Sequence, residues 1–114
     1  MSTRCVVHFG DNDNKKVGSV YIHSDGYPES NYGIPARLSR FFSDVEEQTR
    51  DTRFSDPSYL AAKFVVWAAN QYSSDKDKYL DFLSVGVVNE EPGDINYRYF
   101  VQCQKEPLVT WEEV

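Results

Sequence analysis

The longest run of apolar positions extends from Pro57 to Tyr72 (PSYLAAKFVVWAANQY), and the other predicted elements are organised around it. Asp56 is a favourable N-cap, and Pro57 suits the first helical position, where its missing N–H leaves no bond unmade. The run is too long for a typical strand and rich in alanine, so it predicts a helix. Because this helix is apolar on nearly every side, we expect it in the middle of the core.

Apolar residues at helical spacing predict a second, amphipathic helix from Pro35 to Thr49. Its apolar positions are Ile34, Leu38, Phe41, Phe42 and Val45. Its other face is expected to carry the charged side chains Arg37, Arg40, Asp44, Glu46 and Glu47. This helix therefore packs one side on the core and turns the other to solvent.

Strand patterns flank the two helices. Two β-rich runs, Arg4–Phe9 and Val17–His23, surround a polar turn and predict a β-hairpin. After the helices, Leu80–Asn89 is predicted as a buried strand, Ile95–Gln104 as a strand of alternating polarity, and Leu108–Trp111 as an edge strand.

The resulting order, β-β-α-α-β-β with a further strand at the end, predicts an α+β fold. An antiparallel sheet of four or five strands with two helices packed on one face satisfies this order. A length of 114 residues, with no internal repeat, predicts a single domain spanning residues 1–114.

Composition narrows the classes of function. With 40% hydrophobic and 15% aromatic residues, the chain can build a core. The net charge of −6 argues against direct nucleic-acid binding, which requires clustered Lys and Arg. A cluster of the acidic side chains would imitate a row of phosphates, whereas dispersed acids only solvate the surface. These acids are Asp44, Glu46, Glu47, Glu90, Glu91, Asp94, Glu112 and Glu113.

The cysteines and the apolar segments indicate the cellular compartment of the protein. Two cysteines, Cys5 and Cys103, do not make a disulfide framework, and we expect two buried free thiols in a reducing compartment. The N-terminal residues lack an apolar stretch of signal-peptide length, and no stretch reaches the length of a membrane span. We therefore expect a cytoplasmic protein with no membrane partner.

The loop from His23 to Tyr32 (HSDGYPESNY) is the most informative surface stretch. It offers an imidazole, a carboxylate and two phenols, from His23, Asp25, Tyr27 and Tyr32. Arg37 follows just inside the next helix, whose N-terminus favours an anion. The set fits a pocket for a phosphate-bearing or other polar ligand, or an anchor for a partner protein. It equally fits a structural turn with tyrosines that cap the core.

A second candidate is the charged link Arg50–Asp56 (RDTRFSD). Arg53 has the planar guanidinium that binds a phosphate or a carboxylate through two hydrogen bonds. The alternative is a structural pairing of Asp51 with Arg53 that ties the two helices together. We favour this structural alternative.

Catalytic and metal-binding patterns are absent from the sequence. The two histidines, His8 and His23, are not opposite each other in the predicted hairpin, and no CxxC, HExxH or Gly-rich phosphate loop occurs. His23 with Asp25 would form a general base and its orienting group only if the strand continued that far. We predict no metal and no cofactor.

Part of the chain resembles a group of small phage- and prophage-encoded proteins. The resemblance is carried by Thr3, Arg4, Tyr21, His23 and the segment Asp25-Gly26-Tyr27-Pro28. The stretch DTRFSDPSYLAAKFVVW is similar to this group as well. No activity is assigned to the group, so the resemblance implies a viral or mobile-element origin rather than a mechanism.

These observations predict a non-enzymatic, phage-type protein that binds a host protein or protein complex, such as an anti-CRISPR-like inhibitor of host defence. Its expected contact residues are Asp25, Tyr27, Tyr32 and Arg37. The alternative is a small-ligand protein that binds or cleaves a nucleotide or phosphate ester. There His23 and Asp25 would do the acid–base work, and Arg37 or Arg53 would hold the phosphate. A virion assembly protein is a third reading.

Overall fold

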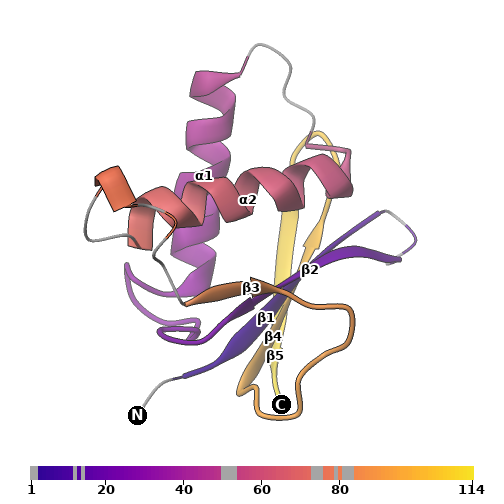
Figure 1. Ribbon diagram of the computed structural model, residues 1–114. Helices are drawn as coiled ribbons and strands as arrows, with labels where there is room; N and C mark the ends of the chain where they lie inside the picture. The colour runs from indigo at the N-terminus through magenta and orange to yellow at the C-terminus, as the bar shows by residue number, and fades with distance from the viewer. Residues whose placement is uncertain are drawn as a thin grey trace.

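The computed structural model describes residues 3–11, 13, 15–49, 54–72, 76–78, 80 and 84–114. These residues form an α+β fold in which one five-stranded sheet carries two long helices on the same face (Figure 1). The predicted fold class and the order of the elements along the chain are confirmed. A short 3-10 helix, η1 (Lys76–Lys78), follows the second long helix.

The sheet has the order β3-β2-β1-β4-β5. Its strands are β1 (Cys5–Gly10), β2 (Lys16–Ile22), β3 (Val85–Val87), β4 (Tyr97–Gln102) and β5 (Leu108–Glu113). The predicted hairpin is confirmed as the antiparallel pair β1–β2. The prediction of a wholly antiparallel sheet is wrong, because β1 and β4 are parallel. Residues 88–96 do not make a hairpin turn but run back along the sheet, so β4 begins at the same end as β1 (Figure 1).

The central strand β1 is buried along its whole length. Cys5, Val7 and Phe9 face the helices and belong to the main hydrophobic cluster. Val6 and His8 point to the opposite face, as alternation along a strand requires, and are buried there as well. The sheet therefore has a dry helix-covered face and a second face that holds a buried polar side chain.

Helix α2 (Pro57–Tyr72) has the predicted bounds, and Asp56 is its N-cap, accepting from the backbone N–H of Tyr59 at 3.3 Å. The expectation that this helix is buried on all sides is wrong. Phe64 is fully buried, but Val66 on the outer side is 64% exposed. The helices form a single layer on the sheet, so nothing among the described residues covers the outer side of α2. No helix in the described part of the chain is long and apolar enough to span a membrane.

Helix α1 (Ile34–Gln48) is amphipathic, as predicted, and buries Ile34, Leu38, Phe41 and Val45. One predicted surface position is wrong: Arg37 is only 7% exposed. Its guanidinium reaches the carboxylate of Asp25 in the preceding loop, so a charged residue lies on the inward side of the helix. Helical spacing alone assigns such a residue to solvent.

The two edge strands differ in length. The strand predicted within Leu80–Asn89 is confirmed as the short edge strand β3 (Val85–Val87), but its expected burial is wrong, since Val87 is 73% exposed. Residues 81–83 of the predicted range lie outside the described part. The predicted last edge strand is confirmed as the longer β5. Another chain can contact the sheet at either of these edges.

The two cysteines are buried and free, as predicted. Burial raises the pKa of the Cys5 thiol to about 12 and that of the Cys103 thiol to about 11. Since the thiolate is the reactive form, both residues are packing groups rather than nucleophiles.

Candidate functional site

The loop that joins β2 to α1 is fixed to the rest of the fold through its backbone. The Gly26 N–H donates to the Thr3 carbonyl at 2.9 Å, and the buried Tyr99 hydroxyl donates to the Gly26 carbonyl at 2.8 Å. The first N–H of α1, at Ile34, donates to the Tyr27 carbonyl at 2.9 Å. The Asp-Gly-Tyr-Pro segment is thus held by the start of β1, by β4 and by α1.

Gly26 has a steric reason to be glycine. A Cβ atom at this position would lie 2.8 Å from the Cβ of Cys5, closer than side-chain carbons approach each other. Asp25, the residue before it, has a φ of 60°, in the left-handed region that Asp and Asn tolerate better than most residues. The backbone at Asp25 and Gly26 therefore has a defined shape.

A polar cluster lies at the end of β2, formed by Arg4, Tyr21, His23 and Asp94 (the His23 cluster). The Arg4 Nε donates to His23 Nδ1 at 3.4 Å, and the Tyr21 hydroxyl lies 2.9 Å from the same nitrogen. Because Nδ1 accepts from a guanidinium, the proton of a neutral His23 ring lies on Nε2. Asp94 is 3.5 Å from Arg4. Burial raises the pKa of Tyr21, and the negative charge of Asp94 adds to that shift.

The structure gives His23 and Asp25 different partners. His23 contacts Tyr21 and Arg4, whereas the Asp25 carboxylate lies 3.7 Å from the Arg37 guanidinium. The acid–base pair suggested by their spacing is therefore replaced by two separate sets of contacts. The sequence did not predict that Asp94 belongs to this cluster, because Asp94 lies 71 residues beyond His23 in the chain.

The remaining predicted site residues differ in exposure. Tyr32 is 70% exposed, and Tyr27 is half-buried. Arg40 donates to the carbonyl of Asn31 at 2.8 Å, which adds another brace to the loop beside Tyr32. Arg53 lies outside the described residues.

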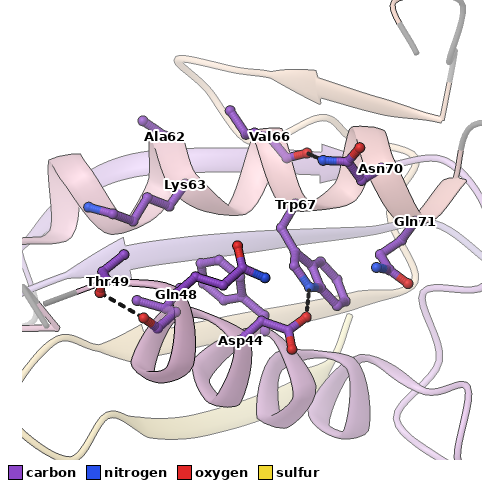
Figure 2. A pocket seen from close by; sticks show the side chains of 11 residues that line it. Asp44, Gln48, Thr49, Ala62, Lys63, Val66, Trp67, Asn70 and Gln71 are labelled. Atoms are coloured by element: carbon purple, nitrogen blue, oxygen red, sulfur yellow. Dashed lines mark hydrogen bonds between the residues drawn. The ribbon is translucent and has the colours of Figure 1, made fainter. Parts of the chain in front are cut away.

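A groove of about 540 Å³ lies between α1 and α2 (Figure 2). Its side chains come from the second half of α1 and from the outward side of α2. They are Phe41, Asp44, Val45, Gln48, Thr49, Ala62, Lys63, Val66, Trp67, Asn70 and Gln71. The sequence predicted the two helices but not a groove between them.

Trp67 lies against the α1 side of this groove. Its indole Nε1 donates to the Asp44 carboxylate at 2.7 Å (Figure 2). The centroids of the Trp67 and Phe41 rings are 5.7 Å apart. Asp44, predicted on the outer face of α1, is half-buried, and its carboxylate reaches across to α2. Gln48, Lys63, Asn70 and Gln71 add polar groups to the groove. This is an apolar surface with a polar rim.

A second polar network lies on the sheet face opposite the helices. His8 places Nδ1 2.7 Å from the Ser19 hydroxyl and Nε2 2.9 Å from the Glu91 carboxylate. Arg98 donates its Nε to the same Glu91 oxygen at 2.7 Å and also pairs with Glu112. Since a carboxylate can only accept, a neutral His8 donates from Nε2 and accepts at Nδ1.

The charged groups of this network shift one another's pKa values. The hydrogen bond from Arg98 lowers the pKa of Glu91 to about 2, and Glu91 in turn raises the pKa of Arg98. Burial lowers the pKa of His8 although Glu91 opposes that shift. Glu91 and Glu112 therefore face an arginine, which leaves less of the acidic set free to imitate phosphates.

Within the described ranges, no group of three His, Cys, Asp or Glu side chains is placed to hold a metal ion. Comparison with protein-family models, with curated proteins and with solved structures found no match for this chain.

Proposed function

We propose that this protein is a non-enzymatic binding protein of phage type, which occupies a surface of a host protein or protein complex. The role would be that of an inhibitor of a host defence system, in the manner of an anti-CRISPR protein. The observation that carries the proposal is the braced loop between β2 and α1, which presents Asp25 and Tyr32 to solvent.

Bracing matters because binding must otherwise supply the free energy of ordering a loop. Immobilising flexible side chains and loops costs about 0.5–1.5 kcal/mol for each side chain. Here the backbone bonds of Gly26 and Tyr27 fix the loop before any partner arrives. Tyr32 then offers a large, rigid contact surface, and tyrosine is enriched among the residues that dominate interface energies.

The state of the titratable groups supports binding over catalysis. The Nδ1 of His23 is occupied by Arg4 and Tyr21, and the Asp25 carboxylate lies beside Arg37. His8 is buried and bonded at both ring nitrogens. The net charge of −6 favours a partner with a basic surface.

A small-ligand function is the second candidate, and the groove between α1 and α2 is the observation that favours it. Its volume of about 540 Å³ lies in the usual range of about 300–1,000 Å³ for ligand pockets. Its lining is largely apolar, with Lys63 as its basic residue, so an apolar or amphipathic ligand suits it better than a nucleotide. Neither His23, the predicted acid–base residue, nor Arg37, a predicted phosphate-binding residue, is among its lining residues.

The binding proposal is tested by affinity capture from a bacterial lysate with three proteins: the wild type, Tyr32→Ala and Tyr59→Ala. Tyr59 is also an exposed tyrosine but lies on α2, so it is a matched control. We expect one protein to be retained by the wild type and by Tyr59→Ala, and retained at least ~10-fold less by Tyr32→Ala. Circular dichroism must first show that all three are folded.

Equal retention by all three proteins would remove the loop from the binding surface. Capture of no protein, together with a small molecule that co-purifies with the wild type but not with Trp67→Ala, would favour the second candidate. The two functions therefore give different results in the same experiment.

A further inference from the structure

The exposed edge of the sheet at β5 suggests a contact that is independent of the proposed function. We propose that two copies of this chain pair through β5 in antiparallel orientation, so that the sheet continues across a two-fold axis. The backbone groups that this edge exposes, its side chains and their symmetry all favour such a pairing.

The register between β4 and β5 identifies which backbone groups face outward. The Val114 N–H donates to the Asn96 carbonyl at 2.9 Å, so these two opposite residues form a hydrogen-bonded pair. Such pairs alternate with non-bonded pairs along antiparallel strands. Glu112–Arg98 and Thr110–Phe100 are therefore bonded pairs, given the observed register.

The alternate residues of β5, namely Val109, Trp111 and Glu113, consequently direct their N–H and C=O groups away from β4. The contacts of β4 are consistent with this assignment. Tyr97 lies opposite Glu113, and its N–H points away from β5 and donates to the Arg4 carbonyl on the β1 side at 3.3 Å. β5 is the last strand in the sheet order. Its outward groups form a row that another strand can bond.

This edge carries few of the usual obstacles to strand pairing, since its only charged side chains are Glu112 and Glu113 at its end. Natural edge strands are commonly short, bulged, or interrupted by proline or lysine. Within Leu108–Glu113 (LVTWEE) the register to β4 is continuous, and no Pro, Gly or Lys occurs. By contrast, the other edge strand, β3, has only three residues. A new strand would therefore add at β5 rather than at β3.

The exposed side chains of this edge match one another under two-fold symmetry. Leu108, Trp111 and Val114 are 51%, 50% and 60% exposed. An antiparallel pairing centred on Trp111 places Trp111 opposite Trp111 of the second copy, and Leu108 opposite Val114 of the second copy. Each large apolar side chain thus meets another apolar side chain, as stable cross-strand pairs require.

The same alignment separates the negative charges. Glu112 lies opposite Thr110 of the second copy, and Glu113 lies opposite Val109. A parallel in-register pairing would instead place each glutamate against its own copy, which is destabilising. Glu112 also pairs with Arg98 in its own chain, which offsets its charge. These features favour a second antiparallel copy of this chain as the occupant of the edge.

The total charge sets how the association depends on salt. Two chains of −6 repel each other, and about 0.1 M salt reduces the range of that repulsion to ~10 Å. We therefore expect a weak dimer that strengthens as salt is raised. Sedimentation equilibrium from about 10 µM to about 1 mM, at low and at moderate salt, measures the dimer dissociation constant.

Amide hydrogen exchange followed by NMR tests the geometry. The N–H groups of Thr110 and Glu112 bond to β4 and should be protected at every concentration. Those of Val109, Trp111 and Glu113 should be protected only at concentrations where the dimer forms. A dimer in which these outward amides exchange as fast as in dilute solution would overturn strand pairing.

Two variants at the exposed position 113 distinguish the contribution of the backbone N–H to dimerisation from that of the side chain. Glu113→Pro removes an outward N–H, which an edge strand tolerates, while Glu113→Ala keeps it. We expect the proline variant to dimerise at least ~10-fold more weakly than the wild type, and the alanine variant to stay within ~3-fold of it. Equal dimerisation of both variants, or a monomer throughout the concentration range, would refute the proposal. Matching amide spectra for residues outside β5 establish that each variant is folded.

Discussion

Replacing Glu91 by glutamine tests whether the polar network on the open face of the sheet stabilises the fold. Glu91 accepts from His8 at 2.9 Å and from Arg98 at 2.7 Å, and its side chain is 23% exposed. Glutamine keeps the shape and one acceptor oxygen but removes the negative charge. Arg98 then keeps Glu112 as its acidic partner.

The expected loss follows from the pKa of this carboxyl group. The Arg98 hydrogen bond lowers the pKa of Glu91 from 4.5 to about 2. At about 1.4 kcal/mol for each pKa unit, that difference has an upper limit of about 3.5 kcal/mol in the free energy of unfolding. Screening by solvent at a partly exposed pair reduces it to about 1–2 kcal/mol.

The sign of the pH dependence is also determined. The folded-state pKa of Glu91 lies below its unfolded value, so the stabilisation is fully present above about pH 4.5. It is lost as the pH falls from there towards 2. Wild type and Glu91→Gln should therefore differ most near pH 7 and converge in acid.

Urea unfolding followed by circular dichroism at pH 7, 5 and 3 measures this difference. Glu90→Gln is the matched control, since Glu90 is the adjacent exposed carboxylate and carries the same charge. We expect Glu90→Gln to unfold with the wild type. If Glu91→Gln had the wild-type free energy of unfolding at pH 7, or if the two variants lost equal stability, the network would have no stabilising role.

Three further predictions concern other parts of the fold. Burial lowers the pKa of His8, so the wild type should lose stability as the pH falls below about 6.5, and His8→Gln should lose less between pH 6.5 and 5 in thermal melts. Gly26→Ala should cost about 1–3 kcal/mol in urea unfolding through overpacking, whereas Gly93→Ala, with open space around it, should be near neutral. Phe64→Ala should cost about 3–5 kcal/mol in the same assay, and the exposed Val66→Ala should cost less than about 1 kcal/mol. Equal losses within either matched pair would contradict the packing described.

The local sequence pattern was sufficient to predict the helices and most strands of this fold. The N-cap Asp56 and the apolar run after it determined the bounds of α2, because capping and hydrophobic length act within a few residues. The β-rich run Val17–His23 likewise predicted β2, in which Val20 and Ile22 are buried. Both predictions rest on short-range rules that the sequence displays directly.

The features that the sequence did not predict depend on contacts between distant residues. His8 and Glu91 are 83 residues apart, so no local pattern joins them. Helical spacing assigned Arg37 to the solvent side of α1. It could not show that Arg37 pairs with Asp25, because Asp25 lies in a loop rather than on the same helix. The parallel pairing of β1 with β4 depends on the direction of the connection at residues 88–96, which turn composition does not specify.

Part of the candidate site was predicted and part was not. The sequence identified the loop from His23 to Tyr32 through its residue types. In the structure, backbone hydrogen bonds hold this loop against the rest of the fold. The groove beside Trp67 was not predicted, because it depends on how α1 and α2 pack together. Helical periodicity places residues on a face of one helix but does not say where two faces leave a gap.

The parallel pairing of β1 with β4 also affects how the protein is made. β1 is the central strand, yet its second neighbour begins only at Tyr97. At synthesis rates of about 5–20 residues per second, the strand waits several seconds for that partner after it has emerged. During this time its unbonded side is open to pairing with other chains, because β2 covers only the opposite side. Completion of the sheet is therefore a late, long-range step, and such steps slow folding. A chain truncated before Tyr97 would keep the hairpin and both helices but leave a buried strand exposed, which makes aggregation its expected fate.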